Sequence, residues 1–193
     1  GIRDQPRSRG LGDVYKRQFL DRDGTLNFDP GYINSLEQYN FFDFTLHALK
    51  QLGDAGNRFC IITNQSGIAR GIVDTDNLSD IHQYILNQFY DNGLDLLGIY
   101  YCSDHPDDVT KNRKPGTGMF QQAAYDHGID LAKSIMIGDT VSDIEAGVNS
   151  GMETMLVLTG KGKASQSKFS DRTPTFIVKN LLEGAQKILR NVS

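Results

Sequence analysis

The sequence predicts an α/β fold: a doubly wound, mostly parallel sheet with helices on both faces, a small flap and no large cap domain. Two observations lead to this prediction. Short apolar runs alternate with longer amphipathic segments along the chain, which is the pattern of strands joined by helical crossovers. The 193 residues suffice for one sizeable core, and no segment is long enough for a second large domain.

Six short runs rich in β-branched and aromatic residues predict the strands. The run at residues 58–63 (RFCIIT) is nearly continuous in apolar residues, as in a strand that is covered on both faces. The first strand ends at Phe19 and Leu20, and residues 14–18 can supply its beginning. The predicted strands are residues 19–20, 58–63, 97–102, 134–138, 153–159 and 175–178.

Apolar residues at helical spacing predict five helices, each of which follows a predicted strand. In the clearest case Leu78, Ile81, Ile85 and Phe89 lie on one face, and Gly93 ends the helix. The predicted helices are residues 44–55, 74–92, 118–127, 141–150 and 181–190.

Two longer segments show neither a helical nor a strand period. Residues 27–40 contain the turn signal Pro30-Gly31 and predict a flap over the carboxyl edge of the sheet. Residues 160–174 are rich in Lys, Ser and Gly, and we interpret their basic cluster as a solvated loop.

Residues 1–18 resemble foreign sequence. Residues 13–18 (DVYKRQ) match the translation of a transposase-based sequencing adapter, so we expect residues 1–18 to be non-native and residues 19–193 to form one domain. A natural, disordered basic arm is the alternative. Without residues 1–18, 15 basic and 22 acidic residues remain, which disfavours nucleic acid as a partner.

The sequence also indicates in which compartment the protein works. No apolar run is long enough to span a membrane, and no signal-peptide pattern is present. The two cysteines, Cys60 and Cys102, make no disulfide framework, so we expect a cytoplasmic protein without membrane partners. No sequence feature marks an interface, and a monomer is the expected state.

Polar residues follow four of the predicted strands: Asp21 and Asp23, Thr63 and Asn64, Lys114, and Asp139 with Asp143. Carboxyl ends of parallel strands share one edge, so these side chains are expected in one crevice. Carboxylates can hold Mg²⁺, and a hydroxyl and an ammonium can bind a phosphoryl group. An ionised Asp21 can attack phosphorus while Asp23 serves as acid and base, which suits transfer through an aspartyl-phosphate.

Each of these elements alone has a plain structural interpretation. Asp23-Gly24 can be a turn after a strand, Thr63 a turn residue, Lys114 a solvated side chain and Asp139 a helix cap. Their order on alternating strands and helices makes the joint signal strong.

The motifs resemble those of the haloacid dehalogenase (HAD) superfamily of phosphatases. Its signatures DxDGT, a strand-ending Thr or Ser, a lysine and GDxxxD are matched at residues 21–25, Thr63, Lys114 and 138–143. From residue 19 onward the chain is similar to the branch that holds heptose bisphosphate phosphatases and histidinol-phosphatases. The segments that carry this similarity are FLDRDGTLN (19–27), PGY (30–32), TNQSGIARG (63–71), GIYYC (98–102), RKP (113–115) and GDTVSD (138–143).

The resemblance implies a role for each matched residue. Asp21 would be the nucleophile and Asp23 the acid and base, while Thr63 and Lys114 would bind phosphoryl oxygens. Mg²⁺ would be held by Asp21, the Asp23 backbone carbonyl and Asp139, with Asp143 in support. The implied substrate contacts are Asp29, Pro30, Gly31, Tyr32, Asn64, Gln65, Ser66, Arg113 and Thr140.

One loop departs from this branch, which usually holds zinc through Cys-x-His and a later Cys-x-Cys. Cys102 remains, but Asp104, Thr110 and Asn112 occupy the other three positions. His105 could replace one ligand, yet two ligands do not close a tetrahedral site, so we expect no zinc. Because this loop lies beside the substrate in the family, its change leaves the exact sugar open.

The resemblance implies hydrolysis of D-glycero-D-manno-heptose 1,7-bisphosphate, in the synthesis of lipopolysaccharide precursors. The first alternative is a phosphatase of histidinol phosphate or another small metabolite, which the sequence barely separates. A catalytically silent sugar-phosphate-binding or scaffold protein is a further alternative, and the intact acidic and lysine motifs argue against it. A nucleic-acid 3′-phosphatase shares similar motifs, but the acidic balance disfavours it.

Overall fold

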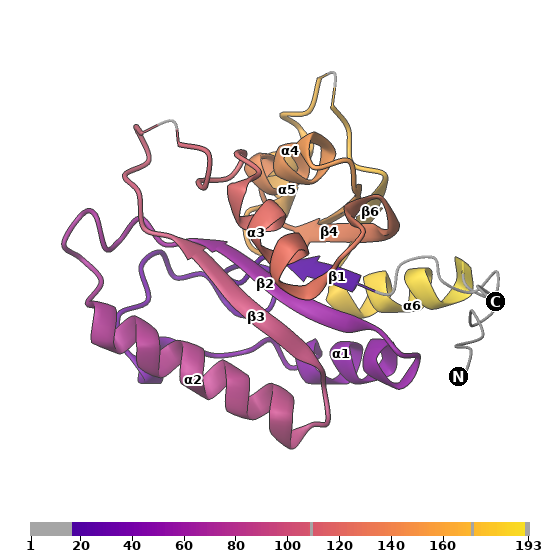
Figure 1. Ribbon diagram of the computed structural model, residues 1–193, viewed down its shortest axis with the longest axis horizontal. Helices are drawn as coiled ribbons and strands as arrows, with labels where there is room; N and C mark the ends of the chain where they lie inside the picture. Colours follow the sequence, from indigo (N-terminus) through magenta and orange to yellow (C-terminus); the bar gives the residue numbers. More distant parts are fainter. Residues whose placement is uncertain (1–16, 109, 171, 192–193) are drawn as a thin grey trace, which may run out of the picture.

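A six-stranded, wholly parallel sheet forms the centre of the computed structural model, which describes residues 17–108, 110–170 and 172–191 (Figure 1). The strand order is β3-β2-β1-β4-β5-β6, and neighbouring strands pair in parallel throughout. The strands are β1 (Arg17–Leu20), β2 (Arg58–Asn64), β3 (Leu96–Cys102), β4 (Ser134–Gly138), β5 (Glu153–Val157) and β6 (Phe176–Val178). The predicted doubly wound α/β fold is therefore confirmed.

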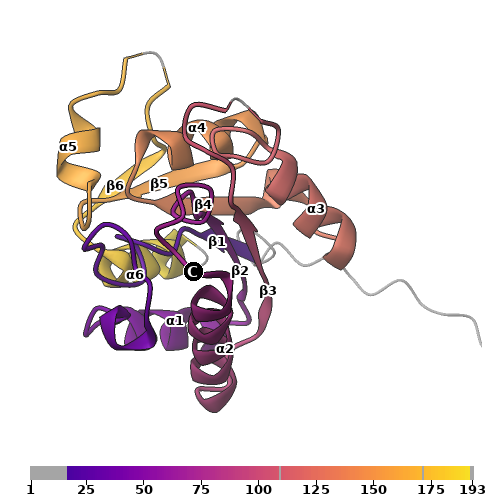
Figure 2. The same cartoon turned by 90° about the vertical axis from the view of Figure 1, so that its left-hand side faces the viewer.

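Helices cover both faces of this sheet (Figures 1 and 2). They are α1 (Thr45–Asp54), α2 (Thr75–Asp91), α3 (Gly118–His127), α4 (Val141–Asn149), α5 (Gly162–Gln166) and α6 (Leu181–Asn191), with 3₁₀ turns at Leu36–Gln38 and Leu131–Lys133. Helices α1, α2 and α6 lie on one face, and α3 and α4 lie on the other. All five predicted helices are present within one residue or two of their predicted bounds.

Two apolar clusters explain this layering. Leu20, Ile61 and Ile137 point to the face of α1, α2 and α6, whereas Phe19 and Met136, one position away on the same strands, point to α3. Successive side chains of a strand alternate between faces, so a strand covered on both sides needs apolar residues at consecutive positions. The continuous apolar runs in the sequence have this cause.

Strand β1 begins at Arg17, inside the segment predicted to be non-native. Gln18 is fully buried, and its side-chain amide donates a hydrogen bond of 2.9 Å to the Asn57 side chain. Arg17 and Gln18 pair with both neighbouring strands and so complete β1, as the sequence suggested. The foreign origin of residues 1–18 stays a prediction, and residues 1–16 lie outside the described residues.

The predicted loop at residues 160–174 is partly wrong, because it contains helix α5. Gly162 lets this short helix pack directly on β5, since a Cβ there would lie 1.8 Å from the Val157 carbonyl oxygen. The Lys- and Ser-rich composition concealed this packing. Within the described residues, no helix is both long and apolar enough to cross a membrane.

Candidate active site

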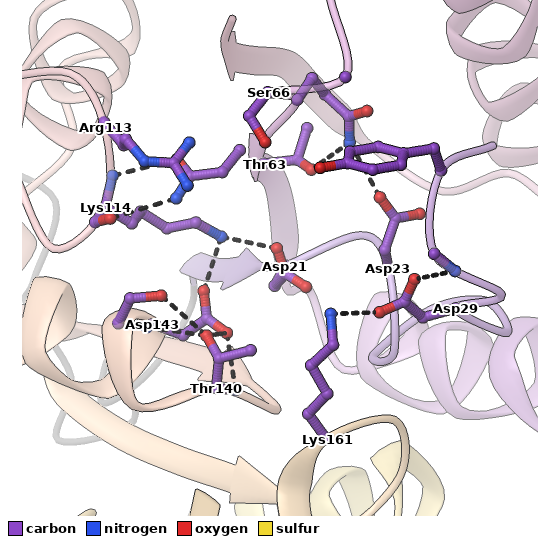
Figure 3. Close-up of a pocket in the computed structure, with 16 residues that line it drawn as sticks. Asp21, Asp23, Asp29, Thr63, Ser66, Arg113, Lys114, Thr140, Asp143 and Lys161 are labelled. Atoms are coloured by element: carbon purple, nitrogen blue, oxygen red, sulfur yellow. Dashed lines mark hydrogen bonds and ion pairs between the residues drawn. The ribbon is translucent and has the colours of Figure 1, made fainter. Parts of the chain in front are cut away.

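The carboxyl ends of the central strands open into a pocket of about 380 Å³ (Figure 3). The chain adds β2 and β3 on one side of β1 and then β4 to β6 on the other side, so the strand order reverses at β1. Ligand sites of open parallel sheets lie at such switch points. Most predicted site residues line the pocket: Asp21, Asp23, Asp29, Gly31, Tyr32, Thr63, Asn64, Gln65, Ser66, Arg113, Lys114, Thr140 and Asp143. Of the others, Asp139 is buried at the end of β4, and Pro30 is exposed on the flap.

Lys114 lies at the centre of the site and is buried. Its Nζ atom contacts Asp21 Oδ1 and Asp143 Oδ1, both at 2.6 Å, and donates to the Ile62 carbonyl oxygen at 2.7 Å. All three ammonium hydrogens therefore have acceptors. Burial alone would lower the pKa of Lys114, but the carboxylates of Asp143 and Asp21 outweigh burial and raise it. Lys114 is thus a fixed positive charge beside Asp21.

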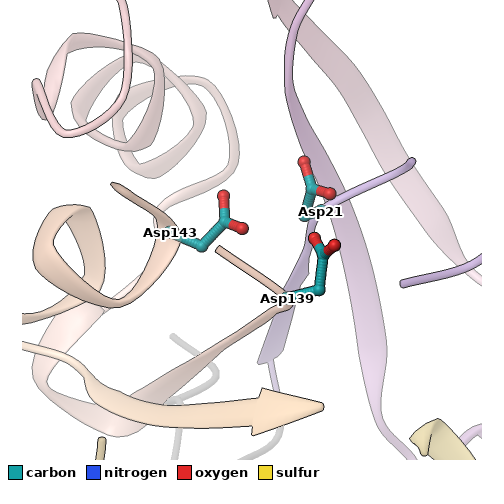
Figure 4. A group of neighbouring side chains, drawn as sticks. All are labelled: Asp21, Asp139 and Asp143. Carbon is teal, nitrogen blue, oxygen red and sulfur yellow. The ribbon is translucent and has the colours of Figure 1, made fainter. Parts of the chain in front are cut away.

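Three carboxylates lie close together: Asp21 and Asp139 follow the ends of β1 and β4, and Asp143 belongs to α4 (Figure 4). Oxygens of Asp21, Asp139 and Asp143 all lie within 4.8 Å of one another. Burial, followed by the charge of Asp143, raises the pKa of Asp139 to about 7, and burial raises that of Asp21 well above its usual range. Asp139 Oδ1 is buried without a hydrogen-bond partner. Crowded carboxylates with a free oxygen are suited to a hard divalent cation.

Asp143 is held more firmly than the other two acids. Its Oδ2 accepts hydrogen bonds from the backbone N–H and the hydroxyl of Thr140, at 2.9 and 2.6 Å, and Thr140 in turn caps the start of α4. This reciprocal capping box fixes the start of α4, which lies within the GDxxxD motif. With Lys114 on its other oxygen, Asp143 has a fixed place in the acidic cluster, and its supporting role toward a metal stays a prediction.

Asp23 is held by four hydrogen bonds. Arg22 donates to both carboxylate oxygens, from Nε at 2.9 Å and from Nη2 at 2.8 Å, and Asn27 and Gln65 each add a side-chain amide bond. Burial would raise the pKa of Asp23, but Arg22 and the amide donors outweigh burial and lower it. Asp23 is consequently held as a carboxylate in this structure.

The sequence prediction missed Arg22, the middle residue of DxD, although its side chain is completely buried. Its Nη1 lies 3.4 Å from Nε2 of His82 on α2, and its guanidinium lies 5.8 Å from the centre of the Tyr39 ring. Burial and the nearby Arg22 lower the pKa of His82 to about 4, so the imidazole is neutral and can accept this hydrogen bond. A buried arginine needs such partners, and the adjacent Asp23 is the one that its position in the sequence could have indicated.

Lys161 lies in the segment interpreted as a solvated loop, and its side chain is 66% exposed, but it also lines the pocket. Its Nζ pairs with Asp29 Oδ2 at 2.7 Å, and its backbone N–H donates to Asp139 Oδ2 at 2.7 Å. Gly160 makes this approach possible, because a Cβ there would lie 2.3 Å from Asp139 Oδ2. Lys161 thus joins the predicted flap to the acidic cluster.

Asn64 connects two of the predicted motifs. Its amide accepts from the backbone N–H of Lys114 at 3.1 Å and donates to the Lys114 carbonyl oxygen at 3.2 Å. This pair of bonds fixes the backbone from which the buried lysine extends. Ser66 and Arg113 line the pocket above it, and their contact with substrate stays a prediction.

Two of the four positions compared with a zinc site, Asp104 and Thr110, are bonded to each other. Thr110 donates its hydroxyl hydrogen to Asp104 Oδ2 at 2.6 Å, and it accepts from the Arg113 backbone N–H at 3.1 Å. The Arg113 side chain donates to the Asp104 carbonyl oxygen at 3.2 Å. Among the described residues, the group of three or more potential metal ligands is the Asp21, Asp139 and Asp143 cluster.

Comparison with known proteins agrees with the site. The "HAD-hyrolase-like" family model matches residues 111–184. The D-glycero-β-D-manno-heptose-1,7-bisphosphate 7-phosphatase of Pasteurella multocida is 42% identical over 153 residues, which cover 76% of this chain and 83% of the relative. The enzyme of the same name from Photorhabdus laumondii is 40% identical over 151 residues, covering 74% of this chain and 80% of the relative.

A solved structure of a heptose 1,7-bisphosphate phosphatase is also similar to this chain. The D,D-heptose 1,7-bisphosphate phosphatase of B. bronchiseptica, crystallised with magnesium and phosphate, superposes with a TM-score of 0.83 at 31% identity and covers 91% of this chain and 99% of its own. With the DxDGT, lysine and GDxxxD motifs meeting at one edge of the sheet, the chain belongs to the HAD superfamily of phosphatases and, within it, to the family of the heptose 1,7-bisphosphate phosphatases.

Proposed function

We propose that this phosphatase removes the 7-phosphate of D-glycero-β-D-manno-heptose 1,7-bisphosphate in the cytoplasm, with Mg²⁺ as its cofactor. The names of its relatives support the substrate. The observation that carries the reaction type is the Asp21 carboxylate, which lies 2.6 Å from Lys114 Nζ at the bottom of an open polar pocket. A nucleophile beside a fixed cation suits the transfer of an anionic phosphoryl group.

In the first step a carboxylate oxygen of Asp21 attacks phosphorus. The bond from phosphorus to the sugar oxygen breaks, and its electron pair stays on that oxygen. Asp23 supplies the proton, and because its partners favour the ionised form it has to take up this proton before the step begins. Lys114 and the Thr63 hydroxyl stabilise the charge on the phosphoryl oxygens. The products of this step are the free alcohol and an aspartyl-phosphate on Asp21.

In the second step water attacks the phosphorus of the aspartyl-phosphate. Ionised Asp23 takes a proton from this water, the bond between phosphorus and the Asp21 oxygen breaks, and inorganic phosphate leaves. The hydrogen bonds from Arg22, Asn27 and Gln65 favour the ionised form of Asp23 that this step needs. Asp21 is thereby regenerated as a carboxylate.

The acidic cluster fits Mg²⁺. Asp21 and Asp139 would hold it, with Asp143 in support, and the partnerless Asp139 oxygen is the observation that favours this assignment. When bound, Mg²⁺ neutralises charge between the nucleophile and the phosphoryl group. The hydrogen-bonded loop of Asp104, Thr110 and Arg113 supports a fold that needs no zinc.

We expect the metal-free protein to lose stability as the pH rises from about 4 to about 7. The pKa of Asp139 is about 7 in the folded protein against 3.8 as its ordinary value, so the folded state binds more protons in that window. Thermal unfolding with EDTA at pH 5 and pH 8 measures this loss. Added Mg²⁺ should raise the melting temperature more at pH 8 than at pH 5.

Asp139→Asn should remove most of this difference, because the amide carries no charge at either pH. Its matched control is Asp130→Asn, at an exposed carboxylate beside Lys133, which should leave the Mg²⁺ response unchanged. An equal Mg²⁺ response of wild-type protein and Asp139→Asn would contradict the assignment of Asp139 as a ligand.

The substrate is tested by phosphate release in Mg²⁺ from heptose 1,7-bisphosphate, fructose 1,6-bisphosphate and histidinol phosphate. We expect kcat/KM to be highest for the heptose by at least about 10-fold, equivalent to about 1.4 kcal/mol of transition-state binding. Preference for histidinol phosphate would show instead that the protein is a histidinol-phosphate phosphatase. Equal, weak rates on all three would show that the altered 104–113 loop has changed specificity. The monomeric state is a separate prediction, which light scattering tests.

A further inference from the structure

Gln65 follows β2 at the edge of the pocket and was predicted from the family resemblance to contact substrate. Its side chain is almost completely buried, with 6% of the residue exposed. Its backbone N–H donates to the Cys102 carbonyl oxygen at 2.7 Å, which ties it to the end of β3. The structure thus gives Gln65 a fixed place before any substrate arrives.

The Gln65 amide nitrogen joins two residues of the reaction. Nε2 lies 2.8 Å from Thr63 Oγ1 and 2.9 Å from Asp23 Oδ2. A primary amide has two hydrogens, and these two contacts use both of them. Both amide hydrogens of Gln65 are therefore committed to the protein, and its amide oxygen is the side-chain atom left for a sugar contact.

The bond to Thr63 has a consequence for phosphate binding. Thr63 is buried, with 1% of its surface exposed, and lines the pocket with Asp21 and Lys114. Because its oxygen accepts from Gln65, the Thr63 hydroxyl hydrogen has to point elsewhere. The hydrogen bonds of the described residues give that hydrogen no acceptor, so it is available to a phosphoryl oxygen.

The bond to Asp23 has a different consequence. Of the other donors to this carboxylate, Asn27 belongs to the same loop as Asp23, and Arg22 lies against His82 on α2. Gln65 is the donor that directly follows β2, the strand that carries Thr63. It therefore sets where the Asp23 carboxylate lies relative to the group that binds the phosphoryl oxygens.

We propose that Gln65 is a positioning residue: its amide fixes the separation between the proton donor Asp23 and the phosphoryl group held by Thr63. This inference rests on the proposed two-step mechanism. Misplaced Asp23 matters most when the leaving oxygen needs a proton, as in an alkyl phosphate, and little when the leaving group is a stable phenolate. That difference separates positioning from a merely structural role.

The test compares Gln65→Leu with wild-type enzyme on glycerol 2-phosphate and on p-nitrophenyl phosphate. In a mechanism through a phosphoenzyme, kcat/KM reports the steps up to release of the leaving group. Hydrolysis of the aspartyl-phosphate therefore does not affect the compared values. We expect kcat/KM to fall on the order of 100-fold for the alkyl ester and by less than about 10-fold for the aryl ester. The smaller loss on the aryl ester would come from the missing hydrogen bond to Thr63, which binds the phosphoryl group of either ester.

Gln65→Asn is the second variant. It keeps an amide but is one methylene shorter and cannot span both partners, so the same difference between esters is expected even if the leucine variant folds poorly. Gln83→Leu on α2, where the exposed amide donates to Asn87 one turn further along the helix, is the matched control and should leave both rates unchanged. Melting temperatures of all three variants accompany the kinetics.

Equal losses on both esters would overturn the proposal, because a structural defect does not distinguish leaving groups. A raised KM for the sugar phosphate with unchanged kcat would also overturn it and restore Gln65 as a substrate contact. Failure of the heptose assignment would appear separately, in the wild-type substrate panel, and would leave the comparison of the two esters valid.

Discussion

Asp21→Asn is expected to lower Mg²⁺-dependent phosphate release by roughly 10⁴-fold or more, while the protein folds normally. The amide keeps the shape of the side chain but cannot attack phosphorus. Phosphate release from the best substrate of the panel, measured at enzyme concentrations high enough to detect the residual rate, gives the size of the loss. Acid quenching followed by mass spectrometry should find phosphate on Asp21 of wild-type protein and none on the variant.

The stability of this variant carries further information. Burial raises the pKa of Asp21 well above its usual range, so the folded, metal-free protein favours a neutral group at this position. Asp21→Asn should therefore melt at the same temperature as wild-type protein in EDTA, or higher at pH 8. A lost rate with unchanged melting assigns the loss to chemistry rather than to unfolding.

Asp54→Asn is the matched control for Asp21→Asn. Asp54 ends α1, its side chain is 64% exposed, and its partner is Lys50 on the same helix. Surface pairs of this kind contribute about 0–1 kcal/mol, so neither rate nor stability should change measurably. Full activity of Asp21→Asn would contradict the covalent mechanism, and phosphate found on another residue would relocate the nucleophile.

Much of the fold could be predicted from the sequence because its strands are covered on both faces. The run at 58–63 and the run at 134–138 are apolar at consecutive positions, and both lie at the centre of the sheet. Gly56 and Gly93 follow α1 and α2 with φ values of +85° and +66°, a region that glycine adopts without strain. Helix α5 was missed because its stability comes from contact with β5 and not from its own composition.

The site residues that could be predicted from the sequence are those that follow a strand. Asp21 and Asp139 end adjacent strands, so parallel pairing alone brings them together. Lys161 and Arg22 could not be found in this way. Lys161 reaches the pocket because Gly160 turns the backbone against Asp139, and Arg22 is buried between Asp23, His82 and Tyr39. Both placements depend on tertiary contacts that sequence spacing does not contain.

Lys114→Met is expected to abolish measurable turnover and also to destabilise the protein. Methionine fills a similar volume but supplies no hydrogens to Asp21, Asp143 or the Ile62 carbonyl oxygen. Breaking a buried ion pair by removing one partner costs about 3–5 kcal/mol, because the remaining charge is left uncompensated. Chemical denaturation in EDTA at pH 8 measures this loss.

The destabilisation should depend on pH. Asp21 already has a pKa raised by burial, and loss of the lysine removes the main group that lowers it. At pH 5 the orphaned Asp21 can take up a proton, so the penalty should be smaller than at pH 8. Lys133→Met, at a lysine that is 59% exposed and lies 3.8 Å from Asp130, is the matched control and should change stability little.

A double variant separates the two roles of Lys114. Lys114→Met combined with Asp143→Asn removes one of the orphaned charges, so it should recover a large part of the lost stability at pH 8. It should recover no turnover, because no cation then faces the phosphoryl oxygens from this side of the pocket. Recovery of both together would mean that Lys114 acts on the reaction only through the fold, and its contact with the phosphoryl group would have to be abandoned.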